Sequence, residues 1–371
     1  QRGAATMSTA SDETASAASL QGASERAAAA QTAGTPGLLA KFIRSQELAW
    51  FGPSDPRVLA ICRMLLFWYV WPGFGVANYS GYAELERWAW YPAGLFEAFS
   101  IAPPSASLLA LVSVVGSVSA LLALVGLLYR LAAPLAAISS FILLGLPQNF
   151  GKVDHSENLL VLALLVFSFA RAADAWSIDA WLRRRWSIGA WLSRRSASGT
   201  ETARVRVTQP SGYYTWPRRF LLLLVVTMYG AAGASKLLHS GWAWALSDSF
   251  RWLLLRHHFT HHPPTQLGVW IANYPALCQG LALGALLTEL LCPLSLLSRK
   301  FSRVLVPALF VLQGAIWLVL GVHFRAMFPV FYCLLPWPAL LLLLERAGLT
   351  RMLDTFAARA RPRPTPAAAK D

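Results

Sequence analysis

The chain has 371 residues, of which 56% are hydrophobic and 13% are charged, and its formal net charge is +14. Such a composition, with 16 tryptophans, argues against a soluble domain and is typical of a protein with several membrane-spanning segments. The basic residues lie between apolar segments, as orientation signals do, so the charge does not indicate nucleic acid as a partner. The 4 cysteines lie in or beside apolar segments without a CxxC pair, which argues against a disulfide framework or a structural zinc site.

The two ends of the chain differ from its apolar middle. Residues 1–38 are rich in Ala, Ser, Thr and Gly and lack hydrophobic periodicity, which predicts a disordered tail. A short interfacial helix is expected over residues 39–50. We therefore divide the chain into an N-terminal tail (1–44), a transmembrane domain (45–345) and a basic C-terminal tail (346–371).

Apolar runs long enough to cross the hydrocarbon, roughly 20 residues each, follow one another through the middle of the chain. The fold class expected is all-α, a helical membrane bundle. Eight spans are predicted, at about 58–78, 105–128, 131–147, 157–175, 218–238, 277–297, 302–322 and 326–345.

The distribution of Lys and Arg orients these spans. With a cytoplasmic N-terminus, the inside segments hold 25 of the 32 basic residues, the outside loops hold five, and Arg63 and Lys236 lie within spans. Cytoplasmic segments carry this excess in membrane proteins. Eight spans with both termini cytoplasmic are therefore predicted, in the cytoplasmic (inner) membrane of a bacterium.

Two connecting segments are long. The basic inside loop over residues 176–217 has tryptophans among arginines in its middle, which is consistent either with an amphipathic helix on anionic lipid or with an ordinary basic loop. The outer loop over residues 239–276 holds five of the seven histidines. A cap over an outward-facing pocket is expected there.

A lysine stands inside the fifth span, after a run of small residues. Lys236 follows Gly230–Ser235, residues that let a neighbouring helix approach closely. A desolvated lysine is a base or a nucleophile. The alternative is a lysine that extends to the headgroups and does no chemistry.

The predicted topology brings polar residues at the start of span four to the depth of Lys236. Asp154, His155 and Glu157 lie there, and His155 is expected to orient the amine or pass on its proton. The same residues also suit a solvated helix start with acids in its first turn.

Other polar residues are candidates for a site or for structural contacts. Histidines 257, 258, 261 and 262 form a cluster followed by two prolines, and we expect no metal there. Glu289, in span six, is a functional candidate or a structural hydrogen-bonding group. Arg63 is expected to pair with a buried acid, Glu289 among the choices, or with carbonyls.

Six motifs in order resemble those of one membrane family. They are SDPRVLAICRMLLFWYV, GLLYR, VDHSENLLVLALLVFSFARAADAWSIDAW, YGAAGASKLLHSGW, TELLCPLSLL and the segment from Phe310 to Phe328. The chain resembles the horizontally transferred transmembrane (HTTM) family, which includes vitamin K-dependent gamma-carboxylase, over about residues 45–345.

The resemblance implies a reaction and its residues. In the carboxylase a lysine that falls on Lys236 deprotonates vitamin K hydroquinone before O2 adds, and a histidine that falls on His155 supports it. Two asparagines of that segment are Val153 and Asp154 here, and a histidine expected in span seven is Gln313. Residues expected to bind substrate are Asp154, Glu157, Tyr229, Trp242, Gln313 and His323, with Arg63 and Glu289 structural.

The large luminal domain of the carboxylase does not follow the membrane part of this chain, which puts carboxylation of a polypeptide with CO2 in doubt. We therefore expect a quinol-dependent oxidoreductase or epoxidase that uses a vitamin K or menaquinone hydroquinone with O2. The alternative is a non-enzymatic membrane component, such as an immunity, transport or assembly factor. Expected partners are membrane lipids and a lipid-soluble quinone or other hydrophobic substrate, without nucleic acid.

The predicted orientation is open to test. A cysteine introduced at Ser240 should react with an impermeant thiol reagent added from outside, and one introduced at Ser198 should not. Labelling in the reverse sense would contradict the orientation and the shared depth of His155 and Lys236.

Overall fold

The structure is a computed structural model, and the residues that it describes are 37–76, 79–151, 156–185, 209–260 and 266–348. Their regular secondary structure is helical throughout, with no strand beyond one isolated bridge between Ser54 and Ser211. The chain divides into two units, 1–48 and 49–371. The helix predicted over 39–50 is α2 (Leu38–Phe51), and all other elements belong to the second unit.

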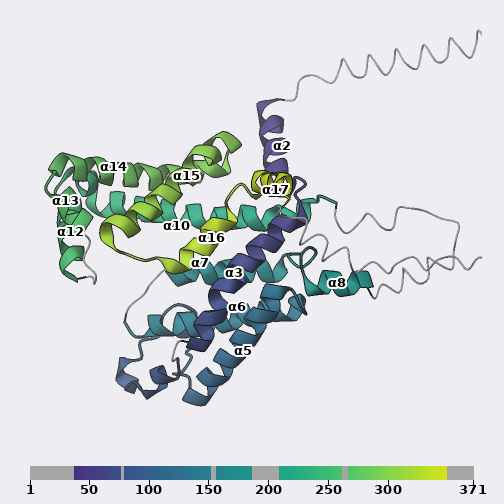
Figure 1. Cartoon of the computed structure of the whole chain (residues 1–371). Helices are drawn as coiled ribbons and strands as arrows, with labels where there is room; N and C mark the ends of the chain where they lie inside the picture. Colours follow the sequence, from purple (N-terminus) through teal and green to yellow (C-terminus); the bar gives the residue numbers. More distant parts are fainter. Residues whose placement is uncertain (1–36, 77–78, 152–155, 186–208, 261–265, 349–371) are drawn as a thin grey trace, which may run out of the picture. The chain divides into compact units, whose positions relative to one another are not determined.

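Among the described residues, six helices are long and apolar enough to cross a membrane, when α6, α14 and α15 are taken with the short segments η3 (Leu146–Asn149), η6 (Cys292–Leu296) and η7 (Ile316–Leu320) that extend them. Figure 1 shows their arrangement. The chain is therefore a multi-pass membrane protein. The six are α3 (Pro56–Val76), α5 (Ala106–Val125), α6 (Tyr129–Gly145), α10 (Trp216–Ser240), α14 (Pro275–Leu291) and α15 (Arg299–Ala315).

The fourth and eighth predicted spans take other forms. The fourth is α7 (Ser156–Phe169), whose 14 residues cover about 21 Å, less than a hydrocarbon core of about 30 Å. The eighth consists of η8 (Arg325–Met327) with α16 (Phe328–Cys333), followed by α17 (Trp337–Arg346) after a bend of 73°. By length alone the described residues thus contain six spans, or seven if the bent pair is one.

The remaining elements are short. Between α3 and α5 lie η1 (Tyr79–Glu84), η2 (Arg87–Ala89) and α4 (Leu95–Ala98). The basic inside loop begins with α8 (Ile178–Arg185) and ends with η5 (Gly212–Tyr214), while its predicted amphipathic part lies outside the described residues. The outer loop contains α11 (Ala243–Leu246), α12 (Ser249–Thr260) and α13 (Gln266–Ala272), all of which pack against α14.

Helices α3, α5, α6 and α7 form one packed group. Four alanines on one side of α6, at 132, 133, 136 and 137, are buried. Small side chains let helices approach closely without a hydrophobic force between them in lipid. Large residues of α3, among them Phe67 and Phe74, fill the space that remains.

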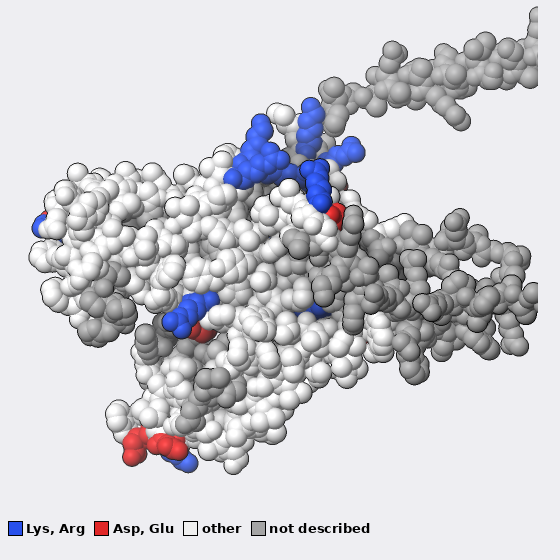
Figure 2. Space-filling model, viewed as in Figure 1, with Lys and Arg blue, Asp and Glu red and all other residues white. Residues whose placement is uncertain are grey.

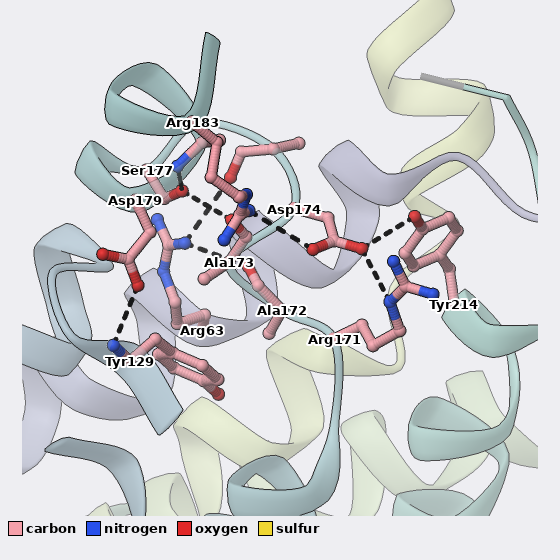
Figure 3. Close-up of polar contacts among 12 residues, drawn as sticks. Arg63, Tyr129, Arg171, Ala172, Ala173, Asp174, Ser177, Asp179, Arg183 and Tyr214 are labelled. Carbon is pink, nitrogen blue, oxygen red and sulfur yellow. Dashed lines mark hydrogen bonds and ion pairs between the residues drawn. The ribbon is translucent and has the colours of Figure 1, made fainter. Parts of the chain in front are cut away.

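A fully buried arginine closes the break after α7 (Figure 3). Nη1 of Arg63 donates to the carbonyl oxygens of Ala172 (2.9 Å) and Ala175 (3.5 Å), and Nη2 donates to that of Trp176 (2.6 Å). The chain leaves the helix at Phe169, six residues before the predicted end, and these carbonyls then have no helical partner. Arg63 therefore binds carbonyls rather than Glu289, because an unsatisfied carbonyl in an apolar interior is costly.

Two aspartates order the same segment (Figure 3). Asp179 accepts hydrogen bonds from the backbone nitrogens of Leu128 and Tyr129, both at 2.9 Å, and so caps the start of α6. Asp174 accepts from the hydroxyl of Tyr214 at 3.0 Å and forms an ion pair with Arg171 at 2.8 Å. The end of α7 is thereby held beside the start of α10, so the two helices run antiparallel.

The basic pair at the start of α10 holds two further helix ends. Arg218 donates to the carbonyl oxygens of Cys333 (2.8 Å) and Leu335 (2.6 Å), at the bend between α16 and α17. Arg219 donates to those of Ser295 (3.5 Å) and Leu296 at the end of η6. Cations suit helix C-termini, where carbonyls lack partners.

Replacing Arg63 with Met should lower the free energy of unfolding by about 2–5 kcal/mol, because three carbonyls lose their donors. Thermal unfolding of the detergent-purified protein measures the change. Arg130→Met is the matched control, since Arg130 is exposed. Equal stability of the two variants would contradict the role given to Arg63.

Candidate functional site

One face of α10 carries the polar residues of the fifth span. Tyr229, Gly233 and Lys236 are spaced i, i+4 and i+7, which puts them on one side of a helix. Tyr229 and Gly233 are buried, whereas Lys236 keeps part of its side chain exposed. The face is directed toward α14 and α15, as the contacts below show.

Gly233 lets α14 approach at the level of the lysine. A Cβ atom at position 233 would lie 2.9 Å from Cβ of Glu289 and 3.1 Å from the backbone nitrogen of Leu290. Both distances are too short for ordinary contact, so a side chain here would force the helices apart. The small residues before Lys236 therefore do what the sequence predicted and admit a neighbouring helix.

The close approach puts a carboxylate on the lysine. Nζ of Lys236 donates to both carboxylate oxygens of Glu289, at 2.5 and 2.6 Å. The Glu289 side chain is 6% exposed and that of Lys236 is 27% exposed. Each charge compensates the other, which reduces the cost of holding ionised groups in apolar surroundings.

An aromatic ring from the outer loop completes the site. Nζ of Lys236 lies 4.7 Å from the ring centroid of Trp244 in α11, within range of a cation–π interaction. The rest of α11 packs on α14, with Ala245 buried against Ala282 and Leu286. The amine thus lies among α10, α14 and α11, and the Lys236 side chain stays partly exposed beside them.

A second polar contact lies two helical turns along the same face. The hydroxyl of Tyr229 donates to Oε1 of Gln313 at 2.5 Å, and both residues are buried. Nε2 of Gln313 is buried and has no hydrogen-bond partner among the residues that the structure describes. The structure therefore brings together Lys236 with Glu289 and Tyr229 with Gln313, along one side of α10.

Several predicted site residues lie elsewhere. Trp242 precedes α11 and is 52% exposed, and His323 is exposed beside the ring of Trp317 at 5.8 Å. Glu157 lies at the start of α7 near Tyr79, whose pKa is raised to about 12 by burial first, then by Tyr82 and Glu157. Asp154 and His155 lie outside the described residues.

The histidine cluster is only partly described. His257 and His258 lie in the last turn of α12, while His261 and His262 lie outside the described residues. Over the described part of the chain, no group of three or more His, Cys, Asp or Glu residues is placed to hold a metal ion.

Comparison of the chain with protein-family models, with curated proteins and with solved structures finds no match. The geometry of the side chains is then the basis for a functional proposal.

The sequence interpretation missed the partner of the lysine. The sequence offers Glu289 as one choice of partner for Arg63, whereas in the structure Glu289 pairs with Lys236. The available signal was that Lys236 and Glu289 are oppositely charged residues inside consecutive predicted spans, where an unpaired charge is costly. The sequence interpretation also did not include Trp244, whose ring lies beside the amine of Lys236.

The change Gly233→Ala should lower the free energy of unfolding by about 1–3 kcal/mol, because the new methyl group meets the backbone of α14. The control is Gly284→Ala, in α14, where an added Cβ meets nothing within 4 Å. That change should be neutral or should stabilise by up to about 1 kcal/mol. Thermal unfolding compares them, and a neutral Gly233→Ala would contradict the close approach.

Proposed function

We propose that this multi-pass membrane protein acts on a lipid-soluble hydroxyl compound, with Lys236 as the base, as a quinol-dependent oxidoreductase or epoxidase of the HTTM kind. The observation that carries the proposal is the Lys236–Glu289 pair, a lysine with a partly exposed side chain whose amine is held by a buried carboxylate. The motif order in the sequence supports the family, and the position of Lys236 in AGASKL supports its role.

The pair can move a proton in balanced steps. Transfer of the ammonium proton from Lys236 to Glu289 leaves a neutral amine beside a neutral carboxylic acid. The amine then accepts the proton of a substrate hydroxyl, and the substrate leaves the step as an anion beside the ammonium. General acid–base catalysis of this type contributes about 10²–10⁴-fold in rate.

The residues around the amine fit a flat aromatic ligand. The ring of Trp244 lies 4.7 Å from Nζ of Lys236, and 27% of the Lys236 side chain is exposed. A reduced quinone bound there would supply an acidic hydroxyl and the electrons that O2 requires. Use of CO2, as in a carboxylase, belongs to the proposal only if that activity is retained.

His155 keeps a place in the proposal as a second partner of the base. The antiparallel packing of α7 on α10 supports it, because the start of α7 then lies toward the Lys236 end of α10. Asp154 and Glu157 belong to the same segment. Glu289 is the partner that the described residues provide.

The finer topology is also a proposal. We infer eight spans with both termini cytoplasmic in an inner membrane, counting α7 as one span and α16 with α17 as another. The excess of Lys and Arg in the inside segments, 25 against five, supports this assignment.

A second candidate function is a non-enzymatic membrane component in which the pair is structural. The observation that favours it is that the pair joins α10 to α14 where Gly233 brings them into contact. The ion pair would then fasten two helices and perform no chemistry.

Three variants separate the two candidates. Catalysis predicts that Lys236→Arg, Lys236→Met and Glu289→Gln each lower oxygen consumption with a reduced menaquinone analogue at least 100-fold, since arginine cannot release its proton. Lys236→Arg should also retain the thermal unfolding temperature, because guanidinium binds carboxylate well. Lys300→Arg, at an exposed lysine, is the control.

Exchanging the charges of Lys236 and Glu289 tests the structural role of the pair. If the pair is structural, combining Lys236→Glu with Glu289→Lys should restore stability lost in either single change. If Lys236 is the base, the double variant should stay inactive whatever its stability. An active Lys236→Arg protein would contradict the catalytic proposal.

A further inference from the structure

A cavity of about 700 Å³ opens at the other end of α10, between α10, α15 and the bend that follows α16. Its polar part contains Arg218, Arg219 and Arg303, with Thr215 and Ser302. No acidic residue lines it. The cavity therefore combines a strong positive charge with an apolar wall.

Within the described part of the chain, the positive charge of the cavity has no acidic counterpart. Arg218 and Arg219 donate to backbone carbonyls, which orient the guanidinium groups but carry no net charge. Nε of Arg219 is buried, and no described residue provides it with a hydrogen-bond partner. Arg303 is exposed, and ion pairs within the described residues include none of the three arginines.

Such a group of arginines favours a phosphate ligand. Guanidinium binds phosphate oxygens through two parallel hydrogen bonds, and it stays charged in any surroundings a membrane protein offers. In Figure 2 the face over α14 and α15 shows few charged residues apart from blue side chains gathered at one end. The charged residues of α15 itself, Arg299, Lys300 and Arg303, all lie in its first turns.

The rest of the cavity is apolar. On α10, Leu222 lines the cavity one turn after Arg219. On α15, Val306 and Phe310 line it one and two turns after Arg303. The wall extends outward to Val311, which is 72% exposed. A ligand that fills both parts must have a charged head and a hydrocarbon chain, since a free phosphate ion would leave the apolar wall bare.

We propose that this cavity binds one anionic phospholipid of the surrounding bilayer. Its phosphate lies among Arg218, Arg219 and Arg303, and an acyl chain follows Leu222, Val306 and Phe310 toward the surface. Charge complementarity selects anionic over zwitterionic lipid, and basic residues near a cytoplasmic leaflet are worth about 1 kcal/mol each toward such lipids.

The lipid site is separate from the proposed proton-transfer site. Arg219 and Lys236 are 17 positions apart on one helix, which at about 1.5 Å per residue is about 26 Å. The inference does not depend on catalysis by Lys236, and each can fail alone. Because Arg218 and Arg219 also hold the ends of η6 and α16, a lipid phosphate beside them should stabilise the fold.

The test uses the full chain purified in a zwitterionic detergent, with native mass spectrometry for bound lipid and thermal unfolding for stability. Dioleoyl phosphatidylglycerol should be retained at one molecule per chain and should raise the unfolding temperature. Dioleoyl phosphatidylcholine and inorganic phosphate should do neither, and dihexanoyl phosphatidylglycerol should bind at least tenfold more weakly than the long-chain lipid.

Arg303→Gln should weaken phosphatidylglycerol binding at least tenfold, and Arg303→Glu should abolish it. Both should fold, because Arg303 is exposed and makes no described hydrogen bond. Arg130→Gln, an exposed arginine outside the cavity, is the control and should bind as the unchanged chain does. Equal retention of both lipids, full binding by Arg303→Gln, or the same stabilisation by phosphate alone would each overturn the proposal.

Discussion

Backbone carbonyls that are left without partners where helices end are the constraint on which this fold depends. In an apolar interior water does not satisfy them, so each broken or short helix needs an internal donor. Arg63 supplies donors after α7, Arg218 at the bend between α16 and α17, and Arg219 at the end of η6. An arginine suits this task because its planar group presents five donors to several carbonyls at once. The arginines thus permit interrupted helices that apolar packing alone would not support.

The Lys236–Glu289 pair differs from these arginine contacts, because it joins two oppositely charged side chains. The arginines bind neutral carbonyls and remain net cations, whereas the lysine meets a full opposite charge at two oxygens. Only the second arrangement offers a proton that two groups can share. It also requires a closer approach of helices, which Gly233 provides. For this reason the chemistry proposed for the chain is placed at the lysine, and the lipid contact at the arginines.

The sequence predicted those features that depend on local pattern. The run from 218 to 238 appears as α10, Trp216–Ser240, because an uninterrupted apolar segment has few alternatives to a helix. The end of α7 at Phe169 and the 73° bend after Cys333 were missed, because the donors that make them possible are more than 100 residues away in the chain. The candidate site was half predicted: Lys236 followed from its span, but its pairing with Glu289 depended on how α10 and α14 align. That alignment depends on Gly233 and on contacts between residues far apart in the sequence, which local sequence patterns do not reveal.

The order in which the chain is made gives these long-range contacts a further consequence. Arg218 precedes its acceptors at Cys333 and Leu335 by 115 and 117 residues. At a synthesis rate of about 5–20 residues per second, α10 emerges roughly ten seconds before the segment that Arg218 must bind exists. During that interval its guanidinium group has to remain among lipid headgroups or water, which leaves the newly inserted helix free to tilt and shift. The final position of α10 is therefore reached only after the segment around Cys333 and Leu335 has been synthesised. The rate of synthesis thus affects how the helices of this bundle assemble.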